Sequence, residues 1–488
     1  MKPQVRLLFS LGLLAIPVYA QSPSDGIKLS DNVTFTATLR ARVYDWDWFE
    51  PAGNFENHYV YSGNFLRLGF AEKAGAWDFD EELMVPFILG LPTRATAPAP
   101  AGGLGLGSNY FTNNGNRQYT AMAFPKQLFA RYHFGTQGSQ IVQAGRTEFS
   151  DATELAPKNE TLAAVKRDHV SSRLISTFGF TDVQRSFDGL RYSWTQPGNQ
   201  DFTFFAATPT RGVFQTDGWG WNRIGFGYAA YTKDWGHGAH AADTRFFVID
   251  YDDFRHIVKT DNRPAAVKAA DLENIHIQTW GGHSIHVFTT GAGIFDALVW
   301  GVAQTGKWGA DKQRSWGFDF EGGYQPPMLP ALKPWLRIGY TTTSGDNNPN
   351  DTRHDTFFQL LPTPRQYART PFFNMMNLDD LSGTLILRPQ AKVTIQSQFD
   401  SLRLENPNDL WYSGGGAYQP WTFGYTGRPV SGQRSLANLY DTGVEYRLNR
   451  HMTFSAYYGY MQGLTIIRKI YPGDKDGTFG YLEALLRL

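Results

Sequence analysis

Asn32–Tyr44 reads NVTFTATLRARVY, and this stretch decides the fold. Every second residue from Val33 to Val43 is apolar, whereas the residues between them are three threonines followed by Arg40 and Arg42. Successive side chains of a β-strand point to opposite faces, so this segment has one apolar face and one polar, charged face. A strand of this kind separates two different environments. It fits a membrane-spanning barrel and also, taken alone, a soluble β-sandwich.

The same pattern recurs along the chain, as about ten to thirteen alternating residues followed by a turn or loop. We predict about eighteen such strands, and an even number is typical of bacterial outer-membrane barrels. Membrane strands need about 9–11 residues, whereas sandwich strands average about five or six. The predicted strands are 33–44, 61–73, 75–85, 126–134, 139–149, 185–195, 201–210, 220–232, 243–255, 275–289, 296–306, 312–324, 333–345, 381–388, 391–404, 435–448, 451–463 and 478–488.

The connections between these strands alternate in length. Short periplasmic turns and long extracellular loops are the outer-membrane pattern, so the sequence predicts an all-β, antiparallel transmembrane barrel. The gaps at 233–242 and 325–332 are longer than this pattern favours. The loops at 150–184 and 346–380 are long enough to fold inward and narrow a pore. The long connections are 45–60, 86–125, 150–184, 256–274, 346–380 and 405–434.

The start of the chain predicts export. Lys2 and Arg6 precede an apolar run, 7–18, and Ala20 ends a signal-peptidase motif, so we expect a signal peptide at 1–20 and a single barrel domain at 21–488. Aromatic residues make up 15% of the chain and cysteine is absent, which suits a barrel without disulfides. The formal net charge is zero, and no basic excess indicates nucleic-acid binding.

Charged side chains within the strands indicate the lumen, because Arg or Lys at the lipid-facing midplane costs about 2–4 kcal/mol. Two interpretations of the inward arginines stay open: they brace a polar wall by pairing with carboxylates, or they form a positive constriction that selects anions. The predicted pore-lining arginines are Arg40, Arg42, Arg67, Arg131, Arg146, Arg191, Arg223 and Arg337. The predicted lumen acids are Asp78, Asp80, Glu82, Asp319, Glu321, Asp441 and Glu445.

Two segments and the terminal strand resemble the alginate export porin family. Ala144–Glu148, AGRTE, is similar to a Gly-Arg-Gln-type segment of that family, with Thr147 where glutamine is usual, and Arg185–Tyr192, RSFDGLRY, looks like the strand that follows it. The resemblance implies a large outer-membrane barrel that passes an acidic polysaccharide through an arginine-lined constriction gated by loops. It assigns a pore-lining role to Arg146 and Arg191.

We therefore expect a Gram-negative outer-membrane channel for passive export or diffusion of an alginate-like anionic polysaccharide or oligosaccharide. Its surroundings are outer-membrane lipid; we expect a monomer, with periplasmic export components as candidate partners, and neither cofactor nor metal. A general, carboxylate-selective or sugar-selective porin is the alternative within transport. A soluble secreted sugar-binding β-protein is a further class, which aromatic residues alternating along the strands disfavour.

Two short segments invite other functions. His283-Ser284-Ile285-His286 is the segment that suggests a barrel-embedded lipid or sugar hydrolase. His283 and Ser284 should point to opposite faces of a strand, so no nucleophile–base pair is built there, and we do not expect an enzyme. Asp346–Asp351 offers oxygen ligands of the kind that calcium takes, although Asn and Asp clusters are more common as plain turns.

Overall fold

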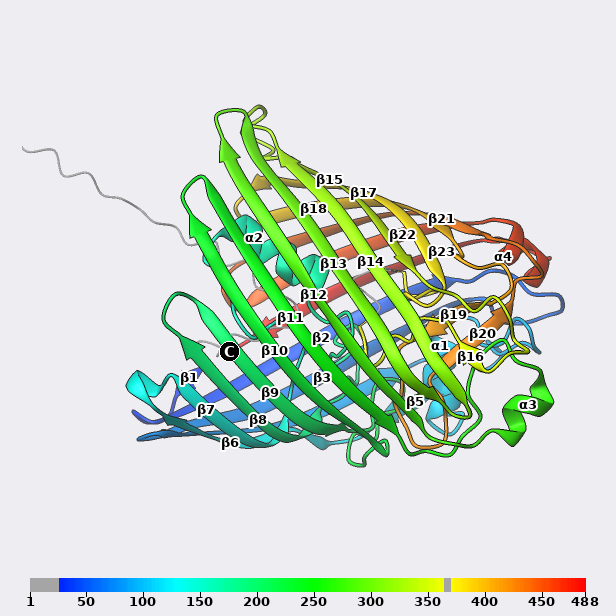
Figure 1. The fold of residues 1–488 in the computed structure, drawn as a ribbon, viewed down its shortest axis with the longest axis horizontal. Helices are drawn as coiled ribbons and strands as arrows, with labels where there is room; N and C mark the ends of the chain where they lie inside the picture. The colour runs from blue at the N-terminus through cyan, green and yellow to red at the C-terminus, as the bar shows by residue number, and fades with distance from the viewer. Residues whose placement is uncertain (1–25, 364–369) are drawn as a thin grey trace, which may run out of the picture.

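The computed structural model describes residues 26–363 and 370–488. The predicted signal peptide, 1–20, lies outside the described residues. Within them, eighteen long antiparallel strands form a closed barrel, tilted across the molecule (Figure 1). The barrel closes where the last strand pairs with the first, with Leu39 opposite Leu486. The predicted fold class is confirmed.

The eighteen barrel strands follow one another in chain order. They are β2 (Val33–Asp47), β3 (His58–Ala74), β4 (Trp77–Leu89), β6 (Phe124–Phe134), β7 (Gln140–Thr147), β8 (Phe187–Gln196), β9 (Gln200–Pro209), β10 (Ile224–His237), β11 (His240–Asp253), β12 (Ile275–Thr290), β13 (Gly293–Trp308), β14 (Asp311–Gln325), β15 (Trp335–Thr343), β17 (Leu378–Gln390), β18 (Val393–Arg403), β21 (Ser435–Arg447), β22 (Met452–Gly463) and β23 (Asp476–Arg487).

The remaining elements are short. Three short strands pair with barrel strands: β1 (Ile27–Lys28) with β2, β5 (Tyr119–Ala121) with β4, and β16 (Arg353–His354) with β14. β19 (Leu410–Gly414) pairs with β20 (Tyr425–Pro429) as a separate hairpin. The helical turns are α1 (Leu106–Asn113), η1 (Thr136–Gly138), α2 (Glu160–Val165), η2 (Lys166–Val170), α3 (Ala265–Ala270) and α4 (Thr465–Ile470). No helix among the described residues is long and apolar enough to cross a membrane.

Each predicted strand overlaps one barrel strand, and the differences lie at the ends. The predicted gap at 233–242 shrinks to a two-residue turn, because β10 and β11 stay paired as far as His237 and His240. The gap at 325–332 persists, since β14 ends at Gln325 and β15 begins at Trp335. Some strands, such as β13, extend further than alternation indicates, whereas others, such as β7 and β15, are shorter.

The two faces of the barrel wall have opposite character. On β2, Arg40, Arg42 and Tyr44 are buried, whereas Ala41 and Val43 between them are exposed. Large apolar side chains cover the outside of other strands in the same way, among them Phe246 at 64% exposed and Leu482 at 66%. An exposed apolar exterior around a polar interior is the arrangement that lipid requires.

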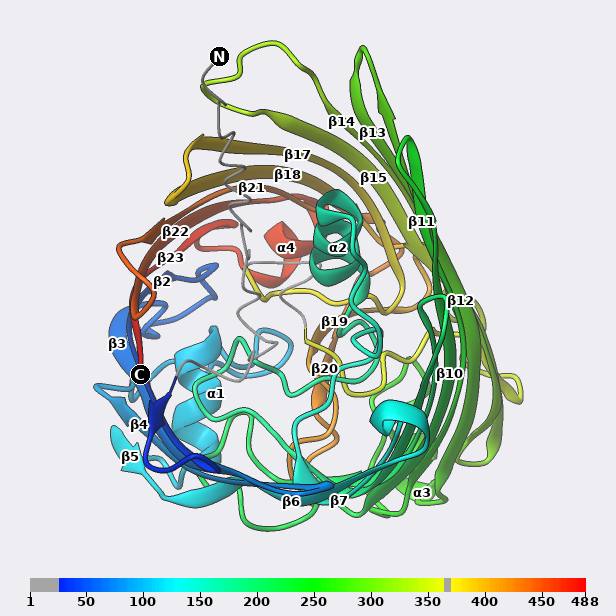
Figure 2. The same ribbon diagram turned by 90° about the vertical axis from the view of Figure 1, so that its left-hand side faces the viewer.

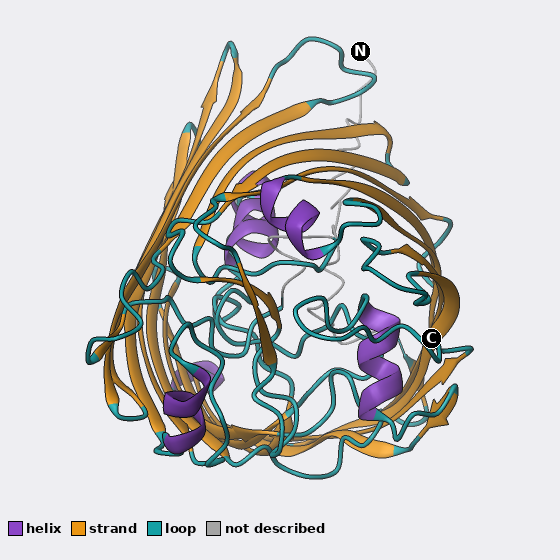
Figure 3. Ribbon diagram, turned by 90° about the vertical axis from the view of Figure 1, so that its right-hand side faces the viewer, coloured by secondary structure: helices purple, strands orange, loops and turns teal. Residues whose placement is uncertain are grey.

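Chain segments fill much of the barrel. Viewed from either end, α1, α2 and α4 lie inside the ring of strands with several long connections, whereas α3 lies at the rim (Figure 2, Figure 3). Apolar side chains of these connections, such as Phe178, Phe180 and Phe214, are buried in one aromatic-rich core with wall residues such as Tyr44. A barrel of this strand number is wide enough for an aqueous channel, and these segments occupy part of that space.

Candidate functional site

Two connections meet inside the barrel. We call residues 148–186, between β7 and β8, the first inward loop, and residues 344–363, which follow β15, the second inward loop. The amide of Leu361 donates to the carbonyl of Leu174 at 2.7 Å, and the amide of Ser176 donates to the carbonyl of Leu361 at 2.8 Å. The Gln359 side chain donates to the carbonyl of Arg173 at 3.0 Å. The two loops are thus joined to each other by hydrogen bonds inside the barrel.

The arginines of β2 attach the first inward loop to the barrel wall. Arg40 donates to the Asp182 carboxylate at 2.6 Å and to the carbonyl of Thr181 at 2.9 Å. Arg42 pairs with Glu483 of β23 and donates to the carbonyl of Phe180 at 3.0 Å. Both guanidinium groups are buried. They lie on the inner face as expected, but they hold protein rather than line open space.

Arg67 and Arg337 are engaged in the same way. Arg67 donates to Glu82 at 2.7 Å and lies 3.1 Å from Glu148 at the start of the first inward loop. Arg337 donates to Glu321 at 2.7 Å and also pairs with Asp296. Both are buried on the inner face. The contacts of Arg67 and Arg337 therefore agree with the interpretation in which inward arginines pair with carboxylates and brace the wall.

Arg131 and Arg191 are more exposed than the four arginines described above, and they form one row on the inner wall. Gln143 of β7 is the Cα partner of both, so β7 alone separates them and their backbones lie about 10 Å apart. The Arg131 side chain is 34% exposed and lies 3.6 Å from Asp78. Arg191 is half-buried and donates to the Ser193 hydroxyl at 3.0 Å; it has no ion pair with any described residue.

Arg146 corrects the prediction, because it faces outward. Its Cα partner on β6 is Leu128, which is 53% exposed, and its partner on β8 is Asp188. Arg146 donates two hydrogen bonds to the Asp188 carboxylate, at 2.7 and 2.8 Å, and the exposed indole of Trp221 donates to the same carboxylate. The prediction placed every strand arginine inside to avoid an uncompensated charge against lipid; here Asp188 compensates it on the outer face.

Arg223 is the second correction. β10 begins at Ile224 and not at residue 220 as predicted, so Arg223 belongs to the preceding loop. It is exposed, with a left-handed φ of 57°, between buried Asn222 and Ile224. Alternation assigns a face only inside a strand, and it therefore misplaced this residue.

The predicted acids lie on the inner faces of three strands. Asp78, Asp80 and Glu82 follow one another along β4, Asp319 and Glu321 lie on β14, and Asp441 and Glu445 lie on β21. Arg173 of the first inward loop pairs with Asp319, and His169 Nδ1 lies 2.8 Å from Glu321.

The sequence interpretation missed several residues of this site. His169, Arg173 and Asp182 belong to a loop, where no periodicity indicates an inward position. Lys126, which contacts Glu148 at 3.3 Å, and Asp400, which is buried, lie within predicted strands. Alternation along β18 could have identified Asp400, whereas Lys126 faces inward because of a register shift in the pairing of β4 with β6, which the sequence pattern does not indicate.

The segments 283–286 and 346–351, which suggested a hydrolase and a calcium site, make hydrogen bonds of the kind found in plain strands and turns. His283 faces inward and contacts Asp243 at 2.6 Å, whereas Ser284 contacts His286 at 3.0 Å on the opposite face. In the 346–351 segment, Asp346 Oδ1 accepts from the amide of Asn348, as in a plain turn. Elsewhere Asp250, Asp252 and His276 come close enough to hold a metal ion, on the outer face of the barrel.

A closed barrel of eighteen strands with an apolar exterior, a charged lumen and inward loops defines a channel of the Gram-negative outer membrane. The sequence profile of the alginate export family matches residues 126–463. Because that match spans more than half of the sequence, the chain belongs to the alginate export family. No curated protein sequence matches it significantly.

Solved outer-membrane proteins share the fold. OccAB2 of Acinetobacter baumannii aligns with a TM-score of 0.58 and 10% identity, over 94% of this chain and 98% of the other. OccK8 (OprE) of Pseudomonas aeruginosa aligns with a TM-score of 0.53 and 11% identity, over 93% and 98%. OpdK of the same species, solved with vanillate, aligns with a TM-score of 0.51 and 9% identity, over 93% and 98%.

Proposed function

We propose that this channel passes an anionic polysaccharide of the alginate type, or its fragments, by passive diffusion. Arg131 and Arg191 contact the carboxylates of the solute. The observation that carries the proposal is the row that these two arginines form on the inner wall, one partly exposed and the other without an ion pair among the described residues. Membership of the alginate export family supports the same class of solute.

The spacing of the row supports a solute with repeated negative charge. Two guanidinium groups separated by one strand attract more than one carboxylate along an extended chain, and rings of Arg or Lys select anions in other pores. The neighbouring acids Asp78 and Asp80 keep the local field moderate, and a transported solute must leave each site as readily as it enters. No covalent step is needed, and the proposed function is transport without catalysis.

A porin for small carboxylates is the second candidate. Inward loops and their aromatic core occupy much of the barrel, which favours a solute smaller than a polymer. OpdK, which shares the fold, was solved with vanillate, an aromatic carboxylate. Both candidates require a preference for anions, and they differ in the length of solute that the passage accepts.

Conductance of the refolded channel in a planar bilayer tests the proposal. We expect oligouronates added to one side to interrupt the current, with interruptions that lengthen as the oligomer grows. Neutral oligosaccharides of matched length should interrupt it far less. Block by vanillate or single uronates alone would favour the small-carboxylate porin, and equal block by neutral and acidic sugars would contradict a role for charge.

A further inference from the structure

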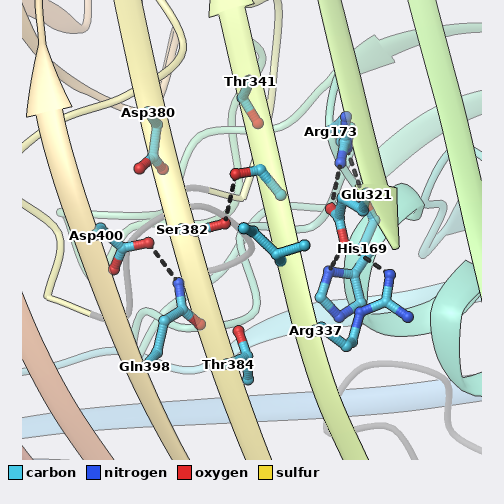
Figure 4. A pocket seen from close by; sticks show the side chains of 12 residues that line it. His169, Arg173, Glu321, Arg337, Thr341, Asp380, Ser382, Thr384, Gln398 and Asp400 are labelled. Carbon is cyan, nitrogen blue, oxygen red and sulfur yellow. Dashed lines mark hydrogen bonds and ion pairs between the residues drawn. The ribbon is translucent and has the colours of Figure 1, made fainter. Parts of the chain in front are cut away.

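A small cavity lies in the barrel wall beside the first inward loop (Figure 4). Its polar lining comes from β14, β15, β17 and β18 on one side and from His169 and Arg173 of the loop on the other. β15 has Gly339 at this point, and side chains pack closely over it: a Cβ there would approach Ser382 Oγ to 2.9 Å and Glu321 Cγ to 3.0 Å. The cavity of about 30 Å³ holds one or two small occupants, since a water molecule needs roughly 10–15 Å³ in this measure.

Strand pairing places four carboxylates around this hollow in two adjacent rows. One row runs Asp319, Thr341, Asp380, and the next runs Glu321, Gly339, Ser382, Asp400, as the Cα partners across β14, β15, β17 and β18. Among the described residues, Arg173 and Arg337 are the arginines that line the cavity, and Arg337 also pairs with Asp296 outside it. Arg337 and His169 hold Glu321, which lines the cavity, and Arg173 holds Asp319 beside it, so these positive groups are engaged with carboxylates other than Asp380.

Asp380 is the carboxylate of the lining to which no described residue supplies a positive charge. It is only 6% exposed, its Oδ1 is buried without a hydrogen-bond partner, and it forms no ion pair with a described residue. Figure 4 places it on the acidic side of the cavity with Thr341, Ser382 and Asp400, opposite the Arg173 and His169 side. A buried carboxylate without a partner is costly unless a positive charge compensates it.

We propose that this cavity binds a hard metal cation, with Asp380 as its principal ligand. Thr341 and Ser382 supply hydroxyl oxygens beside it, and Asp400 supplies a second carboxylate. Carboxylate oxygens are ligands that Ca²⁺ prefers, the hydroxyl oxygens are hard donors as well, and no soft sulfur or free imidazole lies among them. The cavity is too small for a sugar ring, which favours an ion over a solute. The cation then neutralises the wall where Arg173 attaches the first inward loop.

Calcium binding to the full-length protein in detergent tests this site, with isothermal titration calorimetry and Ca²⁺ as the probe. Asp380→Asn removes the charge and keeps the shape, and we expect the affinity to fall at least tenfold. Asp379→Asn is the matched control, because Asp379 is the preceding residue of β17 and lies on the opposite face, where it contacts Arg434 at 2.7 Å. The control should bind as the unchanged protein does. Heat-dependent migration on SDS gels checks that each variant is folded.

The outcomes separate this site from the proposed transport function. No calcium binding by the unchanged protein, or equal binding by both variants and the unchanged protein, would overturn the cation site. If Asp380→Asn fails to fold, Ser382→Ala takes its place, with weakened binding expected and unchanged binding overturning the site. The result does not depend on which solute the channel passes, since the titration contains no solute.

Discussion

At the scale of the residue, the nearest carboxylate decides what an inward arginine does. Arg40 and Arg42 have the same orientation as Arg191, yet Asp182 and Glu483 neutralise the first two. A buried guanidinium paired with a carboxylate contributes to structure, whereas one that stays half exposed remains available to a solute. Charge and alternation therefore placed Arg40, Arg42 and Arg191 on the inner face but did not predict their different roles.

Removing one partner of a buried pair should destabilise the barrel. Glu483→Ala leaves Arg42 buried without this carboxylate, and breaking such a pair typically costs about 3–5 kcal/mol. Urea unfolding from lipid vesicles, followed by tryptophan fluorescence, measures the change. Asp45→Ala is the control: Asp45 is exposed and pairs with the exposed His58, so a change within about 0.5 kcal/mol is expected. Equal effects of the two substitutions would contradict the assignment.

Sequence alone located most site residues on the correct face and failed where its premise failed. Inward positions on β4 and β14 followed from alternation, because large apolar side chains alternate with the acids along those strands. The prediction for Arg146 failed because it assumed that charge avoids the outer face. Asp188, its Cα partner on the next strand, compensates the charge there. The prediction for Arg223 failed because this residue lies in a loop, where alternation assigns no face.

At the scale of the element, the first inward loop depends on a few polar contacts with the wall. Asp182 accepts from Arg40 at 2.6 Å and from the Tyr44 hydroxyl at 3.0 Å. Asp182→Ala should loosen the loop and give a larger, noisier single-channel conductance. Asp217→Ala, at a partly exposed carboxylate that contacts Arg211, should leave the conductance unchanged. An unaltered current in Asp182→Ala would show that this contact does not limit the passage.

The second inward loop should be sensitive to pH. Burial raises the pKa of Asp346 to about 7, and burial raises the pKa of Asp409, whose carboxylate accepts from the amide of Asp346, to about 6. Unfolded Asp has a pKa of about 3.9, so between about pH 4 and pH 7 the folded loop holds protons that the unfolded chain has lost. The free energy of unfolding therefore falls as the pH rises through that window.

Thermal unfolding across this pH range measures the effect. Asp346→Asn cannot ionise, and its unfolding temperature should depend less on pH than that of the unchanged protein. Asp351→Asn, at an exposed position of the same loop, should retain the full dependence. Parallel curves for all three proteins would contradict the assignment to Asp346.

The sequence could not predict that these loops fold inward and pair. Length made it possible for both, but the contacts between Leu174 and Leu361 join segments far apart in the chain. Along a strand, the alternation of apolar and polar residues indicates which face each side chain is on. Loops have no such periodicity, so the contact between the two loops and the inward positions of His169 and Arg173 could be identified from the structure alone.

At the scale of the whole molecule, the closed barrel is what the sequence predicts best. Each strand of about ten residues repeats the same two-faced pattern, and the alternation of short and long connections gives the order of pairing. Closure leaves no unpaired strand edge, so every strand is held by two neighbours. We expect the folded protein to migrate faster than the heated protein on SDS gels. Identical migration before and after heating would contradict a closed barrel.

The central claim is that Arg131 and Arg191 give the lumen its preference for anions. The reversal potential of single channels in a salt gradient tests it most directly, for the unchanged protein, for Arg131→Gln/Arg191→Gln and for Arg146→Gln. We predict that the double variant loses most of the anion preference, whereas Arg146→Gln, on the outer face, keeps it. Unchanged selectivity in the double variant, or an equal loss in Arg146→Gln, would contradict the account.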